Sequence, residues 1–159
     1  ICLRMESKKI NGFLSQEEYK NICLLTPIIC ADLLIRAKDK FLLGRRINKP
    51  AQGEWFFPGG RVFKNETLKE AIIRKAKDEL GLDIADKNIY FIGIDEHFFD
   101  DSRFGGSTHN ISVLYGVRFD EEPEIDFDNT QNQEFKWFSN IDGNWHPYVK
   151  SALRKAGFD

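Results

Sequence analysis

The sequence predicts a mixed α/β fold, in which one β-sheet lies between α-helices. Short apolar segments typical of strands both precede and follow a strongly amphipathic helix between Thr67 and Gly81. The chain has 159 residues, of which 42% are hydrophobic and 30% are charged, as in ordinary globular proteins. This length suits a single domain with its own core. We expect residues 1–12 to be a loosely ordered extension and residues 13–159 to form that domain.

The first third of the chain predicts one helix and two strands. Ser15 is expected to cap a short helix within residues 13–24, because Glu18 three residues later completes a capping box. Branched apolar side chains dominate residues 28–37 and predict a strand, and residues 41–43 return as a second strand after a turn. The segments that follow are a basic loop (44–53), a short extended segment (55–58) and a glycine turn (59–60).

The helix after this turn has the clearest signals in the chain. Thr67 and Glu70 form a second capping box, and Gly81 supplies the left-handed residue that ends a helix. Between them, apolar residues recur at helical spacing, so one face is expected to pack on a core. These apolar residues are Leu68, Ala71, Ile72, Ala76 and Leu80.

The remaining segments predict three strands and a terminal helix. A strand is predicted over residues 89–99, and apolar residues alternate with others along 111–119, with the period of a strand. Residues 120–128 are acidic and are expected to be a solvated connection. A last strand is predicted at 135–138, and Pro147 suits the first turn of a final helix that ends near residue 157.

Charge and composition exclude several classes of protein. The net charge is −2 and the isoelectric point is about 6.0, whereas sequence-independent nucleic-acid binding requires a basic surface. No apolar run reaches the roughly 18 residues of a membrane-spanning helix. The three cysteines (Cys2, Cys23, Cys30) are odd in number, lack the spacing of a metal site, and are expected to be reduced thiols of a cytoplasmic protein without a signal peptide.

One spacing of glycine, acidic and basic residues points to chemistry. Gly60 is followed after five residues by Glu66, then after seven residues by Arg74, and then by Glu79-x-Gly81-hydrophobic. A charged helix face alone is usually a solvated surface with ion pairs between residues four apart. Carboxylates beside a free glycine carbonyl also suit Mg²⁺. This spacing resembles the Nudix box, which implies a mixed sheet sandwiched between helices and hydrolysis of a nucleoside diphosphate linked to another group.

The resemblance extends to one group of Nudix enzymes, the GDP-mannose mannosyl hydrolases, and covers residues 13–138. It implies that water attacks the sugar carbon of a GDP-hexose, GDP-mannose or GDP-glucose, and that GDP and free hexose are released. It also implies a homodimer in which the N-terminal segment contributes to the interface. The segments that carry it are 41–46, 48–53, 55–56, 58–62, 97–101, Thr108-His109, and Gln131 ahead of Trp137.

The same resemblance assigns roles to individual residues. The Gly59 carbonyl, Glu79 and Gln131 would hold Mg²⁺, with Mn²⁺ as a substitute. Arg46 and Arg61 would stabilise the departing diphosphate, a role that suits guanidinium groups. Side chains alternate along a strand, so one of the neighbours Arg45 and Arg46 should face solvent and the other the pocket. We expect Arg46 to be the one that faces the pocket. The remaining assignments are Tyr19 at guanine, Asp32 near the sugar, His97 near the leaving group, and Arg74 as the arginine of the box.

Two positions depart from the pattern. Most Nudix enzymes have Glu at the position of Lys75, and another Glu at that of Asp78. The mannosyl hydrolases also lack the first Glu, which fits a site for one metal ion. Lys75 could pair with Glu79 one turn later and compete with Mg²⁺, or it could point at phosphate as a substitute charge.

The second departure concerns the general base. The mannosyl hydrolases have a histidine directly after the metal-binding Gln, where this chain has Asn132. A neutral amide cannot accept a proton at pH 7. Another residue must then replace the base, or the base is lost. The candidate replacements are Glu134, Asp100, Asp101 and His109.

The sequence thus favours a Mg²⁺-dependent hydrolase that attacks the glycosyl carbon of a nucleotide sugar. A pyrophosphohydrolase yielding a nucleoside monophosphate and a sugar phosphate is the alternative, suggested by Asp78 beside Glu79 and by the missing histidine. A third possibility is a nucleotide-sugar-binding domain with impaired catalysis, suggested by Lys75 together with Asn132.

Overall fold

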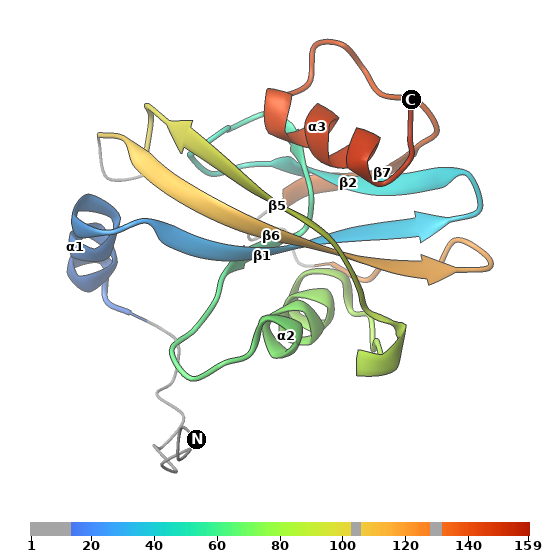
Figure 1. Ribbon diagram of the computed structural model, residues 1–159, viewed down its shortest axis with the longest axis horizontal. Helices are drawn as coiled ribbons and strands as arrows, with labels where there is room; N and C mark the ends of the chain where they lie inside the picture. Colours follow the sequence, from blue (N-terminus) through green and yellow to red (C-terminus); the bar gives the residue numbers. More distant parts are fainter. Residues whose placement is uncertain (1–13, 103–105, 128–131) are drawn as a thin grey trace.

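A computed structural model describes residues 14–102, 106–127 and 132–159 of the chain, which form a mixed sheet with three α-helices (Figure 1). The predicted mixed α/β class is confirmed. In chain order the elements are α1 (Gln16–Leu25), β1 (Ile28–Ala37), β2 (Lys40–Arg46), β3 (Trp55–Phe56), β4 (Gly59–Arg61), α2 (Leu68–Leu80), the 3₁₀ helix η1 (Asp86–Asn88), β5 (Tyr90–Phe99), β6 (Thr108–Phe119), β7 (Asn132–Phe138) and α3 (Pro147–Lys155).

Strand β1 lies at the centre of the sheet and changes partner along its length. The sheet order is β3-β2-β1-β6-β5, with β4 beside β1 and β7 beside β2. Strands β1 and β6 are parallel over ten residue pairs. Strand β2 pairs with β1 near their shared turn, at Arg36 and Phe41, whereas β4 pairs with β1 at its other end, where Asp32 lies opposite Gly59. The end of β1 beside β4 is where the candidate site forms.

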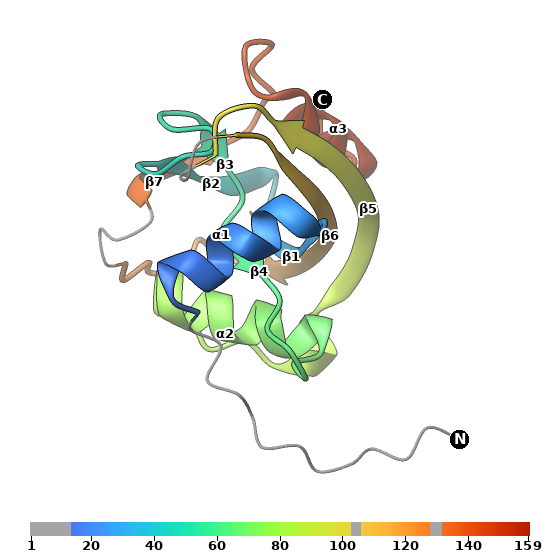
Figure 2. The same ribbon diagram turned by 90° about the vertical axis from the view of Figure 1, so that its left-hand side faces the viewer.

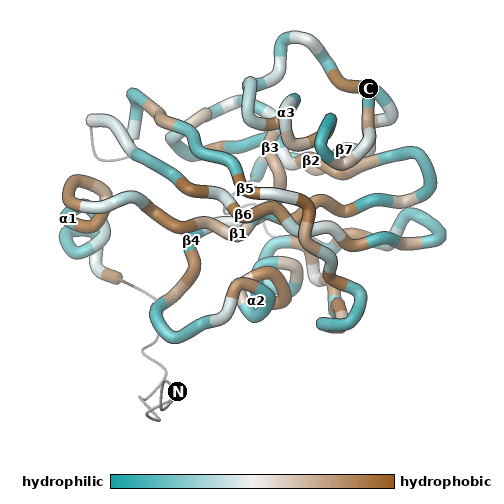
Figure 3. Tube along the Cα trace, viewed as in Figure 1, coloured by the Kyte–Doolittle hydropathy of each residue, from teal (hydrophilic) through white to brown (hydrophobic). Residues whose placement is uncertain are grey.

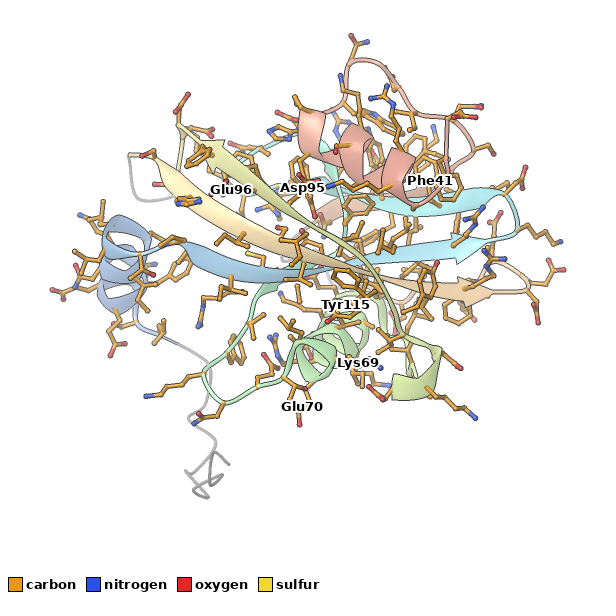
Figure 4. The ribbon with its side chains drawn as sticks, viewed as in Figure 1. Phe41, Lys69, Glu70, Asp95, Glu96 and Tyr115 are labelled. Atoms are coloured by element: carbon orange, nitrogen blue, oxygen red, sulfur yellow. The ribbon has the colours of Figure 1, made fainter. Side chains whose placement is uncertain are left out.

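Helices cover both faces of the sheet and one of its ends. Helix α2 packs on one face and α3 on the other, so each face carries its own apolar cluster. Tyr115 belongs to the cluster under α2 and Phe41 to the cluster under α3 (Figure 4). The hydrophobic colours of β1 and β6 run between these layers in Figure 3. Helix α1 lies across the end of the sheet, in front of β1 and β4 in Figure 2.

The two capping boxes form as predicted. Ser15 Oγ accepts a hydrogen bond from the Glu18 amide, and the Glu18 carboxylate accepts one from the Ser15 amide. Thr67 and Glu70 form the same two hydrogen bonds at the start of α2. Gly81 adopts φ 67° and ends α2, in the left-handed conformation expected of it. The local signals of the sequence therefore determine where both helices begin and where α2 ends.

The structure corrects the predicted glycine turn. Gly59 and Gly60 begin strand β4 and pair with β1, and no turn forms there. A Cβ atom on Gly59 would lie 2.5 Å from Asp32 Oδ1 and 2.6 Å from the Ala31 carbonyl oxygen, so a side chain has no room. The glycine is needed for close approach of two strands. The basic loop is also shorter than expected, since β2 continues to Arg46.

The described residues include no helix that is both long and apolar enough to span a bilayer.

The packing of α2 predicts unequal effects of two isoleucine substitutions. Ile72 is fully buried, whereas Ile94 on β5 is 57% exposed. Ile72→Ala should lower the free energy of unfolding by about 2–5 kcal/mol, because it leaves a cavity, and Ile94→Ala by less than about 1 kcal/mol. Urea denaturation followed by circular dichroism measures both. Equal losses would contradict the packing described here.

Candidate functional site

A cavity of about 380 Å³ opens where α1, β1 and β4 meet. Most of the residues expected to act on substrate line it, although the sequence separates them by up to 78 positions. Arg74 and Glu79 are not among the described lining residues, and Gln131 lies outside the described residues, so its role stays a prediction. The expected residues on the wall are Tyr19, Asp32, Arg46, Gly59, Arg61 and His97.

Arg46 is held at the cavity by the loop that follows β2. Its Nε donates to the Pro50 carbonyl oxygen at 2.8 Å, and its guanidinium lies 5.8 Å from the centre of the Phe56 ring. Arg45 instead donates to the Gly53 carbonyl and lies 3.6 Å from an exposed carboxylate. The expected alternation of the two arginines is confirmed, with Arg46 on the cavity wall.

Arg61 is positioned by an assembly between β4 and α2. Arg74 forms two hydrogen bonds with the Glu66 carboxylate, at 2.6 and 3.0 Å, and also donates to the Arg61 carbonyl oxygen. The guanidinium groups of Arg61 and Arg74 lie 4.8 and 3.7 Å from the centre of the Phe63 ring. Arg74 therefore supports the backbone that carries Arg61, and its own charge is matched by Glu66 rather than by Asp78.

Glu66 keeps its negative charge in this assembly. Burial alone would raise its pKa, but hydrogen bonds from Arg74 and from the Phe63 amide outweigh burial and lower the pKa below the ordinary value. A charged, bidentate pair of this kind fixes direction as well as distance. The box arginine and box glutamate thus act on the geometry of β4.

Lys75 and Glu79 form the i,i+4 pair that the sequence allowed. Lys75 Nζ lies 2.8 Å from Glu79 Oε1, and the side chains are 19% and 8% exposed. Lys75 reaches the cavity wall and lies over Gly60, where an added Cβ would stand 3.1 Å from Nζ. The ammonium group therefore contacts Glu79 and faces the cavity at once.

The donors available to a divalent ion are few. The described residues contain no cluster of three or more His, Cys, Asp or Glu side chains that could hold a metal. Glu79, the expected carboxylate ligand, already carries the Lys75 ammonium. Asp78, the residue before Glu79 on α2, is exposed. Nudix hydrolases generally use divalent ions, but these residues do not build a two-metal site, and a single ion would have to share the Glu79 carboxylate with Lys75, which contacts Oε1.

Asp32 is the carboxylate among the described residues of the cavity wall, and α3 holds it in place. Tyr148 donates its hydroxyl hydrogen to Asp32 Oδ2 at 2.6 Å. Burial raises the pKa of Asp32, although hydrogen bonds from Tyr148 and Ser112 act in the opposite direction. A raised pKa makes this carboxylate a stronger base than an exposed aspartate.

The cavity is also lined by two side chains with buried polar atoms that no described residue satisfies. The atoms are His97 Nδ1 and Thr108 Oγ1, in side chains that are 9% and 7% exposed. The His97 ring stacks on Tyr148 with 4.4 Å between ring centres. Buried polar groups normally have hydrogen-bond partners, so these two atoms mark a place for polar groups of a ligand.

Asn132 is accounted for by packing. It is 7% exposed in β7 and lies against Gly44 of β2, where an added Cβ would meet its Cγ at 2.8 Å. It is absent from the described cavity wall. The position at which the family is expected to have the general base therefore carries a buried amide that packs against β2.

None of the four expected replacement bases lines the cavity. His109 Nε2 lies 2.6 Å from a carboxylate oxygen of Glu96, and its ring stacks on Phe98. Glu134 approaches Arg45, and both remaining carboxylates are exposed. Sequence reasoning missed Tyr148, which arrives from α3 and carries no local motif, and it assigned no role to Thr108 of β6, although Thr108 belongs to a segment of the resemblance. The four expected bases were Asp100, Asp101, His109 and Glu134.

The burial of His97 predicts how it titrates. Burial, helped by the neighbouring His146, lowers the pKa of His97 to about 4. In the unfolded chain the histidine has a pKa near 6.5, so as the pH falls the unfolded state takes up the proton before the folded state does. The contribution of His97 to the free energy of unfolding is therefore complete above about pH 6.5, and about 3 kcal/mol of it is lost by pH 4. NMR of the imidazole should give a midpoint near 4, and His97→Gln should flatten the pH dependence of unfolding. A midpoint near 6.5 would contradict a neutral, buried ring.

Comparison with known proteins agrees with this geometry. The NUDIX domain family matches residues 27–154. The low-salt glycan biosynthesis protein Agl8 of Haloferax volcanii is 38% identical over 152 residues, which cover 94% of this chain and 95% of that protein. An ADP-ribose pyrophosphatase of Methanocaldococcus jannaschii is 38% identical over 76 residues, 48% of this chain and 44% of that protein.

A solved structure shares the fold at lower identity. The MutT NUDIX hydrolase from Burkholderia pseudomallei superimposes with a TM-score of 0.69 and 21% identity, over 82% of this chain and 98% of that one. The Nudix box, the sandwiched mixed sheet and the match over most of the chain agree. The chain belongs to the Nudix hydrolase family.

Proposed function

We propose that this Nudix hydrolase cleaves nucleotide sugars of the GDP-hexose type by attack of water at the glycosyl carbon, releasing GDP and free hexose. The observation that carries the proposal is one cavity lined by both cationic and polar side chains. Arg46 and Arg61 supply positive charge. Asp32 supplies a carboxylate, and His97 and Thr108 supply polar atoms that no described residue satisfies. A diphosphate joined to a sugar needs both kinds of group.

The relatives support a substrate of this class. Agl8 carries the name of a glycan biosynthesis protein and is similar over nearly its whole length. The Methanocaldococcus relative is named for a nucleoside diphosphate attached to a sugar, although it matches over less than half of its length. We infer that the present chain also takes a sugar attached to a nucleoside diphosphate, with Tyr19 of α1 against the base.

Arg46 and Arg61 would stabilise the leaving group. Cleavage at the sugar carbon leaves the bonding electrons on the β-phosphate oxygen, so negative charge grows there during the reaction. Arg46 and Arg61 line the cavity that would hold the diphosphate. The Pro50 carbonyl orients Arg46, and Arg74 supports the backbone of Arg61. Donors fixed beforehand stabilise developing charge without reorganisation.

Asp32 would accept the proton of the attacking water. Its pKa is raised by burial, which makes the carboxylate a better base than an exposed one. Tyr148 donates to one of its oxygens and so fixes the direction of the other. His97 is neutral at pH 7, so its imidazole would hydrogen-bond substrate and not carry charge.

The Gly59 carbonyl and Glu79 would hold a divalent ion, Mg²⁺ or Mn²⁺. Gln131, which lies outside the described residues, is the third proposed ligand. The bound ion would add positive charge at the diphosphate.

We also propose a homodimer in the cytoplasm. The exposed Ile94 and Phe98 on the outer strand β5 offer apolar surface for a second copy. Light scattering of the purified protein would give the oligomeric state.

Isotope labelling tests the position of attack. Incubation of GDP-mannose or GDP-glucose with Mg²⁺ in ¹⁸O-labelled water should place the label in free hexose and leave GDP unlabelled, as read by mass spectrometry and ³¹P NMR. Label in GMP or in hexose 1-phosphate would instead identify the alternative pyrophosphohydrolase. Binding without any product would leave a nucleotide-sugar-binding domain and would refute hydrolysis.

Replacing Asp32 tests the proposed base. Asp32→Asn keeps the shape and should lower kcat by about 10²- to 10⁴-fold, because the amide cannot take a proton. Asp39→Asn, in the exposed turn between β1 and β2, serves as the matched control and should leave kcat unchanged. Steady-state kinetics from pH 5 to 9 measure both variants. An unchanged kcat in Asp32→Asn would remove Asp32 from the mechanism.

A further inference from the structure

Lys75 occupies an unusual position for a helix lysine. Surface lysines usually extend into water, but this side chain is 19% exposed and its ammonium lies 2.8 Å from the buried Glu79 carboxylate. Its Cε and Nζ also lie over the backbone of Gly60, at the start of the strand that carries Arg61. Since a glycine occupies position 60, no side chain separates the ammonium from the cavity.

Three cations converge on one place in the cavity. Arg46, Arg61 and Lys75 come from β2, β4 and α2, yet all three line the same cavity. Their charges also act together on the Cys30 thiol in β1: burial raises its pKa to about 12, and Lys75, Arg46 and Arg61 each act in the opposite direction. Asp32 and Glu79 offset part of this positive charge. The remainder suits an anion.

Glu79 holds the Lys75 ammonium but does not occupy all of its hydrogen-bond donors. An ammonium group has three N–H donors and no acceptor. The carboxylate of Glu79 takes one donor, because the two residues lie one turn apart on α2. The remaining donors are on an ammonium that faces the cavity. The pair therefore holds a cation at a defined height above Gly60, in a region sheltered from solvent screening.

We propose that Lys75 is a diphosphate-binding residue, whose ammonium, anchored by Glu79, donates to the phosphate oxygens beside Arg46 and Arg61. It supplies, as part of the chain, positive charge that Nudix enzymes with Glu at this position obtain from divalent ions. The inference rests on the proposed function, because its ligand is the diphosphate of that substrate. It also explains why the Glu79 carboxylate carries an ammonium rather than standing free.

Binding without metal separates this role from others. Isothermal titration calorimetry in EDTA would measure the affinity for inorganic pyrophosphate and for GDP. The wild type should bind both. Lys75→Gln should weaken both affinities about 10- to 100-fold, the effect of losing a hydrogen bond from a charged group. Lys77→Gln is the matched control, since Lys77 lies on the exposed side of the same helix and pairs with Asp83, and it should bind as the wild type does.

A second variant tests the exchange of lysine for metal. Lys75→Glu restores the carboxylate of the common pattern beside Glu79, so it should lose affinity for pyrophosphate in EDTA and gain affinity for Mn²⁺. Electron paramagnetic resonance of free Mn²⁺ measures the gain without reference to activity. Circular dichroism confirms that each variant folds. Unchanged pyrophosphate affinity in Lys75→Gln, or unchanged Mn²⁺ affinity in Lys75→Glu, would overturn the proposal.

The two proposals fail in different ways. If Lys75→Gln weakens pyrophosphate binding but the wild type releases no hexose from GDP-hexoses, Lys75 keeps its role and the proposed reaction is wrong. If hexose is released but pyrophosphate affinity in EDTA does not depend on Lys75, the reaction stands and the assignment of Lys75 is wrong. Absence of pyrophosphate binding to the wild type in EDTA would also refute the assignment.

Discussion

The close contact between β4 and β1 is the constraint on which the site depends. Gly59 lies opposite Asp32 with no space for a side chain between them, so the two backbones can approach. That approach places the end of β4 beside the cavity and turns Arg61 toward it. It also brings Gly60 under the Lys75 ammonium of α2. A larger residue at position 59 would separate the carboxylate of β1 from the cations of β4 and α2.

Charge in the cavity is arranged by pairing some groups and leaving others to a ligand. Arg74 pairs with Glu66 and donates to the Arg61 carbonyl, so it supports the strand that carries Arg61. Arg46 and Lys75 are each anchored by one partner and still line the cavity. The cavity also carries a neutral imidazole and a carboxylate held by Tyr148. Anchored cations next to a polar recess are preorganised for an anion attached to a sugar.

Local signals account for the parts of the fold that the sequence predicts well. The capping boxes at Ser15 and Thr67 and the left-handed Gly81 involve residues within four positions of one another. The strand period likewise predicts that Arg45 and Arg46 face opposite ways, and Arg46 is the one on the cavity. The spacing of the Nudix box correctly predicts the family, because its residues lie on or next to one strand and the helix that follows it.

Long-range packing accounts for what the sequence does not reveal. Tyr148 reaches Asp32 across 116 positions, so no spacing predicts the pair. Asn132 is a packing residue because β7 presses it against Gly44, a contact that depends on sheet register. Both alternatives for Lys75 were consistent with helical spacing. The structure shows that the lysine pairs with Glu79 and also faces the cavity, because β4 passes close to α2.

The orientation of a bound nucleotide sugar is the most direct test of this account. A crystal structure of Asp32→Asn with GDP-mannose would show it. The account predicts phosphate oxygens within hydrogen-bond distance of Arg46, Arg61 and Lys75, and the hexose against His97, Thr108 and position 32. A ligand with its hexose among the cations, or a diphosphate held away from Lys75 with Glu79 released from its lysine, would contradict it.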